Sequence, residues 1–497
     1  MIERWVLAFG QKRSLDAVSD ELPLCLWCLR WLLDELKLSS RKSKCQFLYT
    51  PLLLVGSLDR RQAGAPVARL RAPEEKNREG NVALCLLERK RPLNLMGSFL
   101  TDATGGSRNF HFAIIGEEMF ESIEPLDVYN KNINILIGSG ASADLFPTLG
   151  LAIKNAKDEW ETVETLATRY ENNPDKKTAL FMHYYNMCIL PVQTFNPANV
   201  TTAKGKINFK NYETFLKTLL GLLDRRKDLN RKINIFTTNY DGCLTHSADS
   251  ILMKGSHDFV VNDGTSGFHC KHLHAKNFNT FHCQTGIFER SNYGVPQLNI
   301  IHLHGSVYWS KSGDKIEVKY KNEFKNIIHT KTLAKIEKFS GYITTEGGVS
   351  FKVPSVSFTS TQRENFWREY NKLPIVNPTK WKFHETVFEE HYYQMLRFLS
   401  YELEKPNSIL ISFGFSFADE HIRKLVQRSL SNPQLQTFIC CYSQSSAESM
   451  REEFKLWKNV IIIGPPEGEK LDFTNFNKYI FSLKAEKYES PEDKDGL

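Results

Sequence analysis

The chain has 497 residues, of which 41% are hydrophobic and 24% are charged, and its formal net charge is +7 at pH 7. It is long enough for one large or two to three medium globular domains with a substantial core. The positive excess is too small to indicate nucleic-acid binding by itself, so direct binding of nucleic acid is not expected.

The first 118 residues carry no motif to which we assign chemistry. Their longest apolar run, 22–33, contains Arg30 and is shorter than the roughly 20 residues that span a membrane. The opening residues lack the order of a signal peptide, which favours a cytoplasmic protein. We expect 1–118 to be an N-terminal extension, either poorly ordered or an artefact of gene prediction with Met119 as the true start, and 119–497 to be the main domain.

Ten cysteines are scattered along the chain. With no secretory leader expected, this distribution favours reduced thiols over a disulfide framework. Cys25 and Cys28 form a Cys-x-x-Cys pair without a second pair at zinc-ribbon spacing, which indicates a coincidence on a helix face rather than a metal or redox site.

An apolar run that ends in glycines, at 133–142, organises the rest of the chain. Apolar residues at 133, 135, 136 and 137 predict a buried parallel strand. Gly138 and Gly140 follow, and glycines at this place let the backbone turn so that bare N–H groups face a phosphate. The stretch indicates a nucleotide-binding turn, although an ordinary turn after a strand gives the same pattern.

The elements after this strand alternate between helices and strands. Residues 151–226 have helical spacing and predict a helical insertion, about 145–230, of the kind that forms one wall of a cleft. Further apolar strands are expected at 232–238, 297–303, 408–413, 436–442 and 459–463. Between them lie helices at 385–403 and 419–430 and two long excursions at about 254–297 and 310–380. The pattern predicts an α/β fold with a doubly wound, Rossmann-like parallel sheet of six strands.

Polar residues stand where two of these strands end. Asn239 and Asp241 follow the second strand, and His304 follows the third. Open parallel sheets bind ligands at the carboxyl ends of their strands. An asparagine amide suits the fixing of a water or a ribose hydroxyl, and an imidazole suits proton transfer near neutral pH. Each has a structural alternative: Asn239 as a turn cap, His304 as a buried core histidine, and Asp241 as a support of its loop.

Two groups of histidines have the chemistry of metal ligands, and neither is predicted to bind a metal. His302 and His304 alternate on one strand face, but the sequence places no third ligand beside them. The second group is irregularly spaced in an asparagine- and phenylalanine-rich stretch, which favours a loop or a wall of the cleft. Its members are His269, Cys270, His272, His274, His282 and Cys283.

Four motifs occur in one order along the chain, namely Gly138-Ser-Gly-Ala-Ser142, Thr237-Thr-Asn-Tyr-Asp241, Leu303-His304-Gly305 and Gly414-Phe-Ser416. Together they resemble the sirtuin superfamily, whose pattern is Gly-Ala-Gly-x-Ser, Thr-Gln-Asn-x-Asp, His-Gly and Gly-Thr-Ser. The stretches 375–380 (Ile-Val-Asn-Pro-Thr-Lys) and 414–422 (Gly-Phe-Ser-Phe-Ala-Asp-Glu-His-Ile) are most similar to sirtuin-like NADases of bacterial anti-phage defence, especially those paired with a HerA-type ATPase. The resemblance covers about residues 125–465.

Two departures set the chain apart from the deacylases of that superfamily. Where they have Gly-Ile-Pro-x-Phe-Arg, this chain has Asp144-Leu-Phe-Pro147-Thr-Leu149, without a matching arginine. They also carry a four-cysteine zinc module, and no pair of Cys-x-x-Cys motifs lies between Asp241 and Gly414. Both differences argue against protein deacylation.

The resemblance implies an NAD⁺ hydrolase that releases ADP-ribose and nicotinamide, with Asn239, His304 and Asp241 as catalytic residues. It implies that the substrate NAD⁺ is bound by Gly138, Gly140, Ala141, Ser142, Thr238, Gly414 and Ser416. It also implies a homo-oligomeric toxic effector of phage defence that a HerA-type ATPase restrains. An NAD-dependent deacylase or ADP-ribosyltransferase, and a catalytically silent NAD⁺ or ADP-ribose sensor, stay open as alternatives. Nucleic-acid binding by residues 1–118 is a weaker one.

Overall fold

The computed structural model describes residues 112–115, 118–121, 123, 128–285, 292–320, 324–379 and 389–483. Its first element is an antiparallel hairpin of β1 (Phe112–Ile115) and β2 (Glu118–Glu121). This hairpin crosses the predicted boundary at residue 118. The remainder of the predicted extension, including the Cys25 and Cys28 pair, lies outside the described residues.

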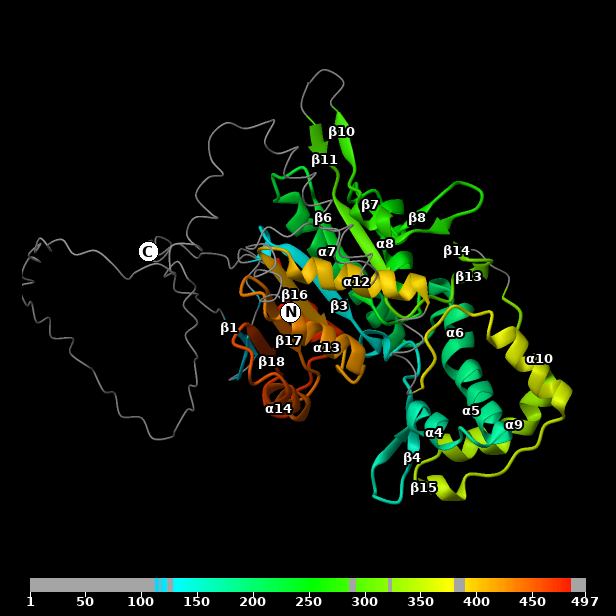
Figure 1. Cartoon of the computed structure of the whole chain (residues 1–497). Coiled ribbons are helices and arrows are strands. Elements are labelled where there is room, and N and C mark those ends of the chain that lie inside the picture. The colour runs from blue at the N-terminus through cyan, green and yellow to red at the C-terminus, as the bar shows by residue number, and fades with distance from the viewer. Residues whose placement is uncertain are drawn as a thin grey trace, which may run out of the picture. The chain divides into compact units, whose positions relative to one another are not determined.

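A sheet of seven parallel strands forms the centre of the described region (Figure 1). In spatial order the strands are β18 (Val460–Ile463), β17 (Gln436–Cys440), β16 (Ser408–Phe413), β3 (Asn132–Ile137), β6 (Lys232–Thr237), β12 (Gln297–His302) and β7 (Val260–Asn262). This confirms an α/β fold with a parallel sheet, which is compatible with a Rossmann-like fold. The expected number of six strands was wrong, because β7 lies inside the predicted excursion 254–297. With three residues, β7 is too short to show a period.

The strands that follow β3 in the chain lie on both sides of it within the sheet. β6 and β12 lie on one side of β3, and β16, β17 and β18 lie on the other. The strand order therefore reverses between β3 and β16. Open α/β sheets bind ligands in the crevice outside the carboxyl ends of their strands at such a reversal. The residues that follow β3, β6, β12 and β16 all stand at this edge.

A row of buried asparagines crosses three neighbouring strands near the centre of the sheet. Asn134 of β3 is in register with Asn234 of β6, which is in register with Asn299 of β12. Asn234 Nδ2 donates to Asn134 Oδ1 over 2.9 Å, and Asn299 Nδ2 donates to Asn234 Oδ1 over 2.8 Å. A slip of one residue would leave these buried amides unpaired. The row therefore fixes the register of the strands whose ends carry the candidate site.

Helices pack on the sheet. They are α7 (Ala203–Asp224), α8 (Cys243–Met253), α12 (Glu390–Glu404), α13 (Glu420–Ser429), α14 (Gln444–Glu453) and α15 (Phe473–Asn475). α12 contacts β16 and β3, and α7 contacts β6 and α8. α12 and α13 match the helices expected at 385–403 and 419–430, apart from 385–388, which lie outside the described residues. No helix in the described part of the chain is long and apolar enough to cross a membrane.

The predicted insertion, 145–230, opens with a hairpin instead of a helix. Its strands β4 (Gly150–Lys154) and β5 (Trp160–Thr162) are antiparallel, and Asp158 between them has a φ of 65°. Helices follow as expected: α4 (Val163–Arg169), α5 (Pro174–Tyr184), a π-helical segment (Tyr185–Ile189), α6 (Leu190–Gln193) and α7. The sequence predicted helices here and missed the hairpin, because β5 has only three residues.

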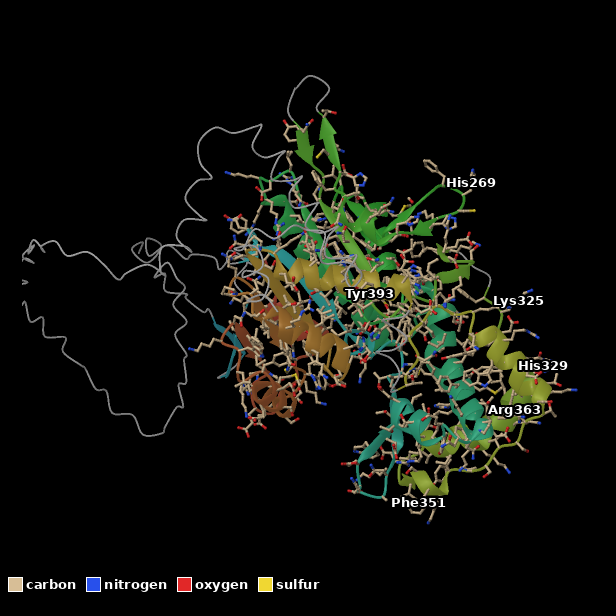
Figure 2. All side chains as sticks on the ribbon, in the orientation of Figure 1. His269, Lys325, His329, Phe351, Arg363 and Tyr393 are labelled. Atoms are coloured by element: carbon tan, nitrogen blue, oxygen red, sulfur yellow. The ribbon has the colours of Figure 1, made fainter. Side chains whose placement is uncertain are left out.

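The second predicted excursion, 310–380, supplies the other half of a helical lobe (Figure 1). It contains α9 (Thr330–Thr344), α10 (Ser360–Tyr370) and β15 (Gly348–Val349), and it was wrongly expected to be mostly loop. α9 and α10 pack on α5, and β15 pairs with β4. Trp367 Nε1 of α10 donates to Thr178 Oγ1 over 3.1 Å, and Arg363 (Figure 2) is 2.7 Å from the Asp175 carboxylate.

Short antiparallel strands make up the remaining loops. β13 (Trp309–Ser312), β14 (Lys315–Val318), β9 (His272–Leu273) and β8 (Thr265–Ser266) form a small sheet in that order. β10 (Cys283–Thr285) pairs with β11 (Asn292–Gly294). β7 to β11 lie in the first predicted excursion, whereas β13 and β14 lie at the start of the second. The first excursion reaches the edge of the parallel sheet through β7, which pairs with β12.

Candidate active site

The two glycine turns predicted to bind a dinucleotide pack against each other where β3 and β16 end. Gly138 N donates to Phe413 O over 3.2 Å, and Gly140 N donates to Gly414 O over 2.9 Å. Ala141 N donates to Gly138 O over 3.1 Å. The expectation of bare N–H groups at Gly138 and Gly140 is therefore wrong. These glycines are needed because the two backbones are in contact, which leaves no room for a Cβ.

The glycine in the Leu303-His304-Gly305 motif also permits a close backbone approach. Gly305 has a φ of 85°, and a Cβ on it would lie 2.0 Å from Pro374 O. The chain there runs beside the site, since Val376 N donates to His304 O over 2.9 Å. Tyr240 OH donates to Val376 O over 2.8 Å. The hydrogen bonds of His304 and Tyr240 thus hold the segment 374–378 beside the ends of β12 and β6.

Ser142 is the centre of a buried hydrogen-bond network below the first glycine turn. Its hydroxyl donates to Asp241 Oδ2 over 2.8 Å and lies 2.6 Å from the Tyr212 hydroxyl. Burial raises the pKa of Tyr212 well above its usual value, so the phenol keeps its proton and donates to Ser142. The other oxygen of Asp241 accepts from Cys243 N over 3.0 Å. Asp241 thereby ties the start of α8 to the turn after β3, which is the structural role considered for it.

The backbone N–H and the side-chain amide of Asn239 together donate three hydrogen bonds. Its backbone N–H donates to Thr237 Oγ1 over 3.0 Å, and its Nδ2 donates to Gly138 O over 3.1 Å and to Ser142 Oγ over 3.3 Å. The residue is only 8% exposed. Its Oδ1 is buried and accepts no hydrogen bond from the described residues. A buried acceptor without a donor is costly unless a ligand or water supplies one.

The two histidines of β12 and its turn have different partners. His302 Nδ1 donates to Asn239 O over 2.9 Å, and burial lowers the pKa of His302, so this ring is neutral at pH 7. His304 Nε2 lies 3.1 Å from His421 Nε2 at the start of α13. His302 therefore supports the backbone of Asn239, whereas His304 pairs with another imidazole.

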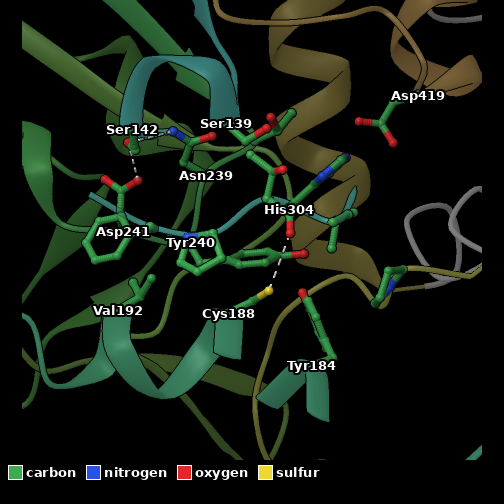
Figure 3. Close-up of a pocket in the computed structure, with 16 residues that line it drawn as sticks. Ser139, Ser142, Tyr184, Cys188, Val192, Asn239, Tyr240, Asp241, His304 and Asp419 are labelled. Atoms are coloured by element: carbon green, nitrogen blue, oxygen red, sulfur yellow. Dashed lines mark hydrogen bonds between the residues drawn. The ribbon is translucent and has the colours of Figure 1, made fainter. Parts of the chain in front are cut away.

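A pocket of about 130 Å³ opens at this edge of the sheet, between the strand ends and the helical lobe. Figure 3 shows Ser142, Asn239 and His304 on one side of it and Tyr184, Cys188 and Val192 on the other. The second group belongs to α5, the π-helical segment and α6, so the insertion does form one wall of a cleft. The remaining lining residues are Ser139, Phe146, Pro147, Thr148, Leu149, Thr238, Tyr240, Asp241, Pro378 and Asp419.

Comparison of the chain with models of known protein families and with curated protein sequences gives no match.

The predicted residues divide into two sets. The pocket is lined by Ser142, Thr238, Asn239, Asp241 and His304. The other set consists of Gly138, Gly140, Ala141, Gly414 and Ser416, which do not line it. Four of these build the junction of the two turns, and exposed Ser416 accepts a hydrogen bond from Ala418 N over 3.4 Å.

Sequence reasoning missed several residues of the site. Tyr212 and Tyr184 come from the insertion, where a buried tyrosine on a helix cannot be told from an ordinary core residue. Burial raises the pKa of Cys188, which lines the pocket, to about 12, so its thiol is neutral. Asp419 and His421 stand in the stretch 414–422, which was quoted for the resemblance without assigning them a role.

The irregular His and Cys group of the first excursion does not converge on one point. Cys270 and Cys283 are free and exposed, and Figure 2 shows His269 at the outer end of a loop. Within the described ranges, one group of three residues has the geometry of metal ligands, and it consists of His304, Asp419 and His421.

Proposed function

We propose that the protein hydrolyses NAD⁺ to ADP-ribose and nicotinamide. The observation that carries this proposal is that Asn239 and His304, which follow adjacent strands, line one pocket beside the reversal of strand order. The pocket is lined by Asn239, whose Oδ1 accepts no hydrogen bond from the described residues, and by the imidazole of His304. Its opposite wall consists of uncharged side chains. The amide and the imidazole are groups for holding a sugar hydroxyl or a water and for removing one proton.

The reaction asks little of the protein. The nicotinamide of NAD⁺ leaves as a neutral ring, so no acid has to protonate it. The bond to the ribose breaks through an oxocarbenium-like state, which water then attacks. The site therefore needs to orient the ribose and the water and to accept the proton that the water loses.

Asn239 and His304 divide this work. The amide Nδ2 of Asn239 is fixed by Gly138 O and Ser142 Oγ, which leaves Oδ1 to accept a hydrogen bond from the ribose or from the water. His304, whose ring meets that of His421, takes the proton of the attacking water. Tyr212 acts as a positioning residue, because it supports Asn239 through Ser142. Ser142 and Asp241 line the pocket themselves, and their hydrogen bond holds the Asn239 amide and its turn in place.

The pocket size supports a proposal for the part of NAD⁺ that enters it. A cavity of about 150 Å³ in a protein core accepts a benzene molecule, so a pocket of about 130 Å³ suits one six-membered ring. We place the nicotinamide there. The pyrophosphate and adenosine then lie outside the pocket. We propose that they are bound along the turns of Gly138 to Ser142 and Gly414 to Ser416.

The biological setting follows from the resemblance described above. We propose a cytoplasmic, homo-oligomeric effector of anti-phage defence, whose NAD⁺ consumption a HerA-type ATPase partner controls. This part is tested separately, by measuring NAD⁺ loss by the protein with and without the product of the neighbouring gene, and by determining its mass in solution.

The direct test incubates the purified full chain with NAD⁺ alone and measures nicotinamide and ADP-ribose. Equal amounts of both products, without any added protein, support hydrolysis. Products that form only when an acylated or acceptor protein is added would instead indicate a deacylase or an ADP-ribosyltransferase. Saturable NAD⁺ binding without nicotinamide release would indicate a sensor and would overturn the proposal.

A further inference from the structure

Three potential metal ligands converge at the edge of the pocket. His304 follows β12, while Asp419 and His421 lie at the start of α13, which follows β16. One ligand atom from each residue lies within 4.8 Å of the other two. Segments that are more than a hundred residues apart in sequence thus bring two imidazoles and a carboxylate together, and sheet topology alone does not require this.

The distance between the two imidazoles fits a shared metal ion. Their Nε2 atoms are 3.1 Å apart. Two nitrogens that bind one tetrahedral zinc ion at 2.0–2.1 Å are about 3.3 Å apart, so only a few tenths of an ångström of movement is needed. The two rings are 4% and 9% exposed, and their positions are therefore set by packing.

The identity of the three groups narrows the kind of ion. Two imidazoles and one carboxylate form a ligand set of zinc enzymes and of other borderline divalent ions, whereas calcium and magnesium prefer oxygen ligands alone. Asp419 and His304 both line the pocket. An ion held by them would therefore face the pocket with an open position, as in catalytic rather than structural zinc sites.

We propose that His304, His421 and Asp419 bind one divalent ion of the zinc class. The ion takes up the Nε2 lone pair of His304. This nitrogen then cannot accept a proton, and metal binding competes with the hydrolysis proposed above. The competition rests on the proposed function, whereas the metal site itself does not.

Metal binding is tested on the full chain after treatment with a chelator, using Co²⁺ as a spectroscopic probe and Zn²⁺ in titration calorimetry. We expect one equivalent of either ion and a Co²⁺ spectrum without the charge-transfer band of a thiolate ligand. His421→Ala and Asp419→Asn should each weaken binding by about tenfold or more, while folding is checked by thermal denaturation. His269→Ala, which removes an exposed histidine, is the matched control and should bind as the wild type does.

The outcomes decide the metal site independently of the enzyme activity. Wild-type protein that binds no stoichiometric Co²⁺ or Zn²⁺ would overturn the proposal. So would two folded variants that both bind as tightly as wild type, or a thiolate spectrum, which would place the ion on a cysteine. If NAD⁺ is hydrolysed, Zn²⁺ should inhibit the wild type and a chelator should restore its rate. If NAD⁺ is not hydrolysed, the binding data still test the site.

Discussion

Gly138 and Gly414 touch so closely that a Cβ on Gly138 would lie 2.4 Å from Gly414 O. Gly414 has a φ of 64°, and a Cβ on it would lie 2.5 Å from Ala141 N. The obstructing atoms belong to the backbone and cannot rotate away. The ends of β3 and β16 are therefore locked together, and the turn that carries Ser142 and anchors Asn239 is fixed in place.

Gly138→Ala should lower the free energy of unfolding by about 3 kcal/mol, at the upper end of the cost of overpacking, because two backbones must separate. Gly341→Ala is the control: Gly341 is exposed on α9, and a Cβ there meets nothing within 4 Å. The control should gain up to about 1 kcal/mol from helix propensity. Urea denaturation measures both variants, and equal stabilities would show that the contact of the two turns does not matter.

Tyr212→Phe removes the donor to Ser142 and so loosens the support of Asn239. We expect a loss of about 1 kcal/mol in stability. If Tyr212 is a positioning residue, kcat for NAD⁺ should fall more than KM rises, since Asn239 still reaches the pocket but is held less firmly. Tyr320→Phe, which removes a hydrogen bond to Asp263 of 3.0 Å outside the pocket, should cost similar stability and leave kcat unchanged. A normal kcat in Tyr212→Phe would contradict the positioning role.

Cys188→Phe places a ring in the pocket from its helical wall. If the nicotinamide enters this pocket, KM for NAD⁺ should rise by about tenfold or more, or about 1.4 kcal/mol of binding energy. Cys188→Ala keeps the space open and should bind normally, because the buried thiol is neutral. Steady-state kinetics compares the two variants. An unchanged KM in Cys188→Phe would place the substrate elsewhere.

His183 of α5 makes the stability of the lobe depend on pH. Burial lowers the pKa of His183 to about 4, from 6.5, so between these values the unfolded chain binds a proton that the folded protein does not. Stability is therefore greatest above pH 6.5 and falls as pH decreases towards 4. From pH 7 to 5, His183 accounts for a loss of about 2 kcal/mol. In urea denaturation at the two pH values, the free energy of unfolding of His183→Leu should therefore fall by about 2 kcal/mol less than that of the wild type. The same pH dependence in both proteins would contradict this.

The parallel sheet was predictable because its strands are buried on both faces. Runs such as 133–137 and 408–413 are nearly continuous apolar stretches with sharp ends, and such runs can be recognised in a single sequence. β7 and β5 were missed because three residues carry no period. α9 was missed although Ile336, Phe339 and Ile343 are buried at helical spacing, because the whole stretch 310–380 was interpreted as one long loop excursion.

The site was predictable only where strand order fixes it. Asn239 and His304 follow adjacent strands, so parallel pairing alone brings them to one edge. Tyr212, Cys188 and His421 come from helices whose packing no local pattern specifies. The glycines were found because a sequence shows where a backbone must turn or approach another group closely. It did not show that Gly138 N and Gly140 N donate to the end of β16 and the turn after it, and binding of a phosphate by these turns stays a prediction.

The most direct test of the account is the rate of nicotinamide release from NAD⁺ by Asn239→Ala. Asn477→Ala is the matched control, because Asn477 is 7% exposed against 8% for Asn239, and its Oδ1 also lacks a partner among the described residues. We predict that the wild type and Asn477→Ala release nicotinamide, whereas Asn239→Ala is folded and slower by about 10²-fold or more, an effect typical of a lost group at a reacting centre. Release by folded Asn239→Ala at the wild-type rate would contradict the central claim.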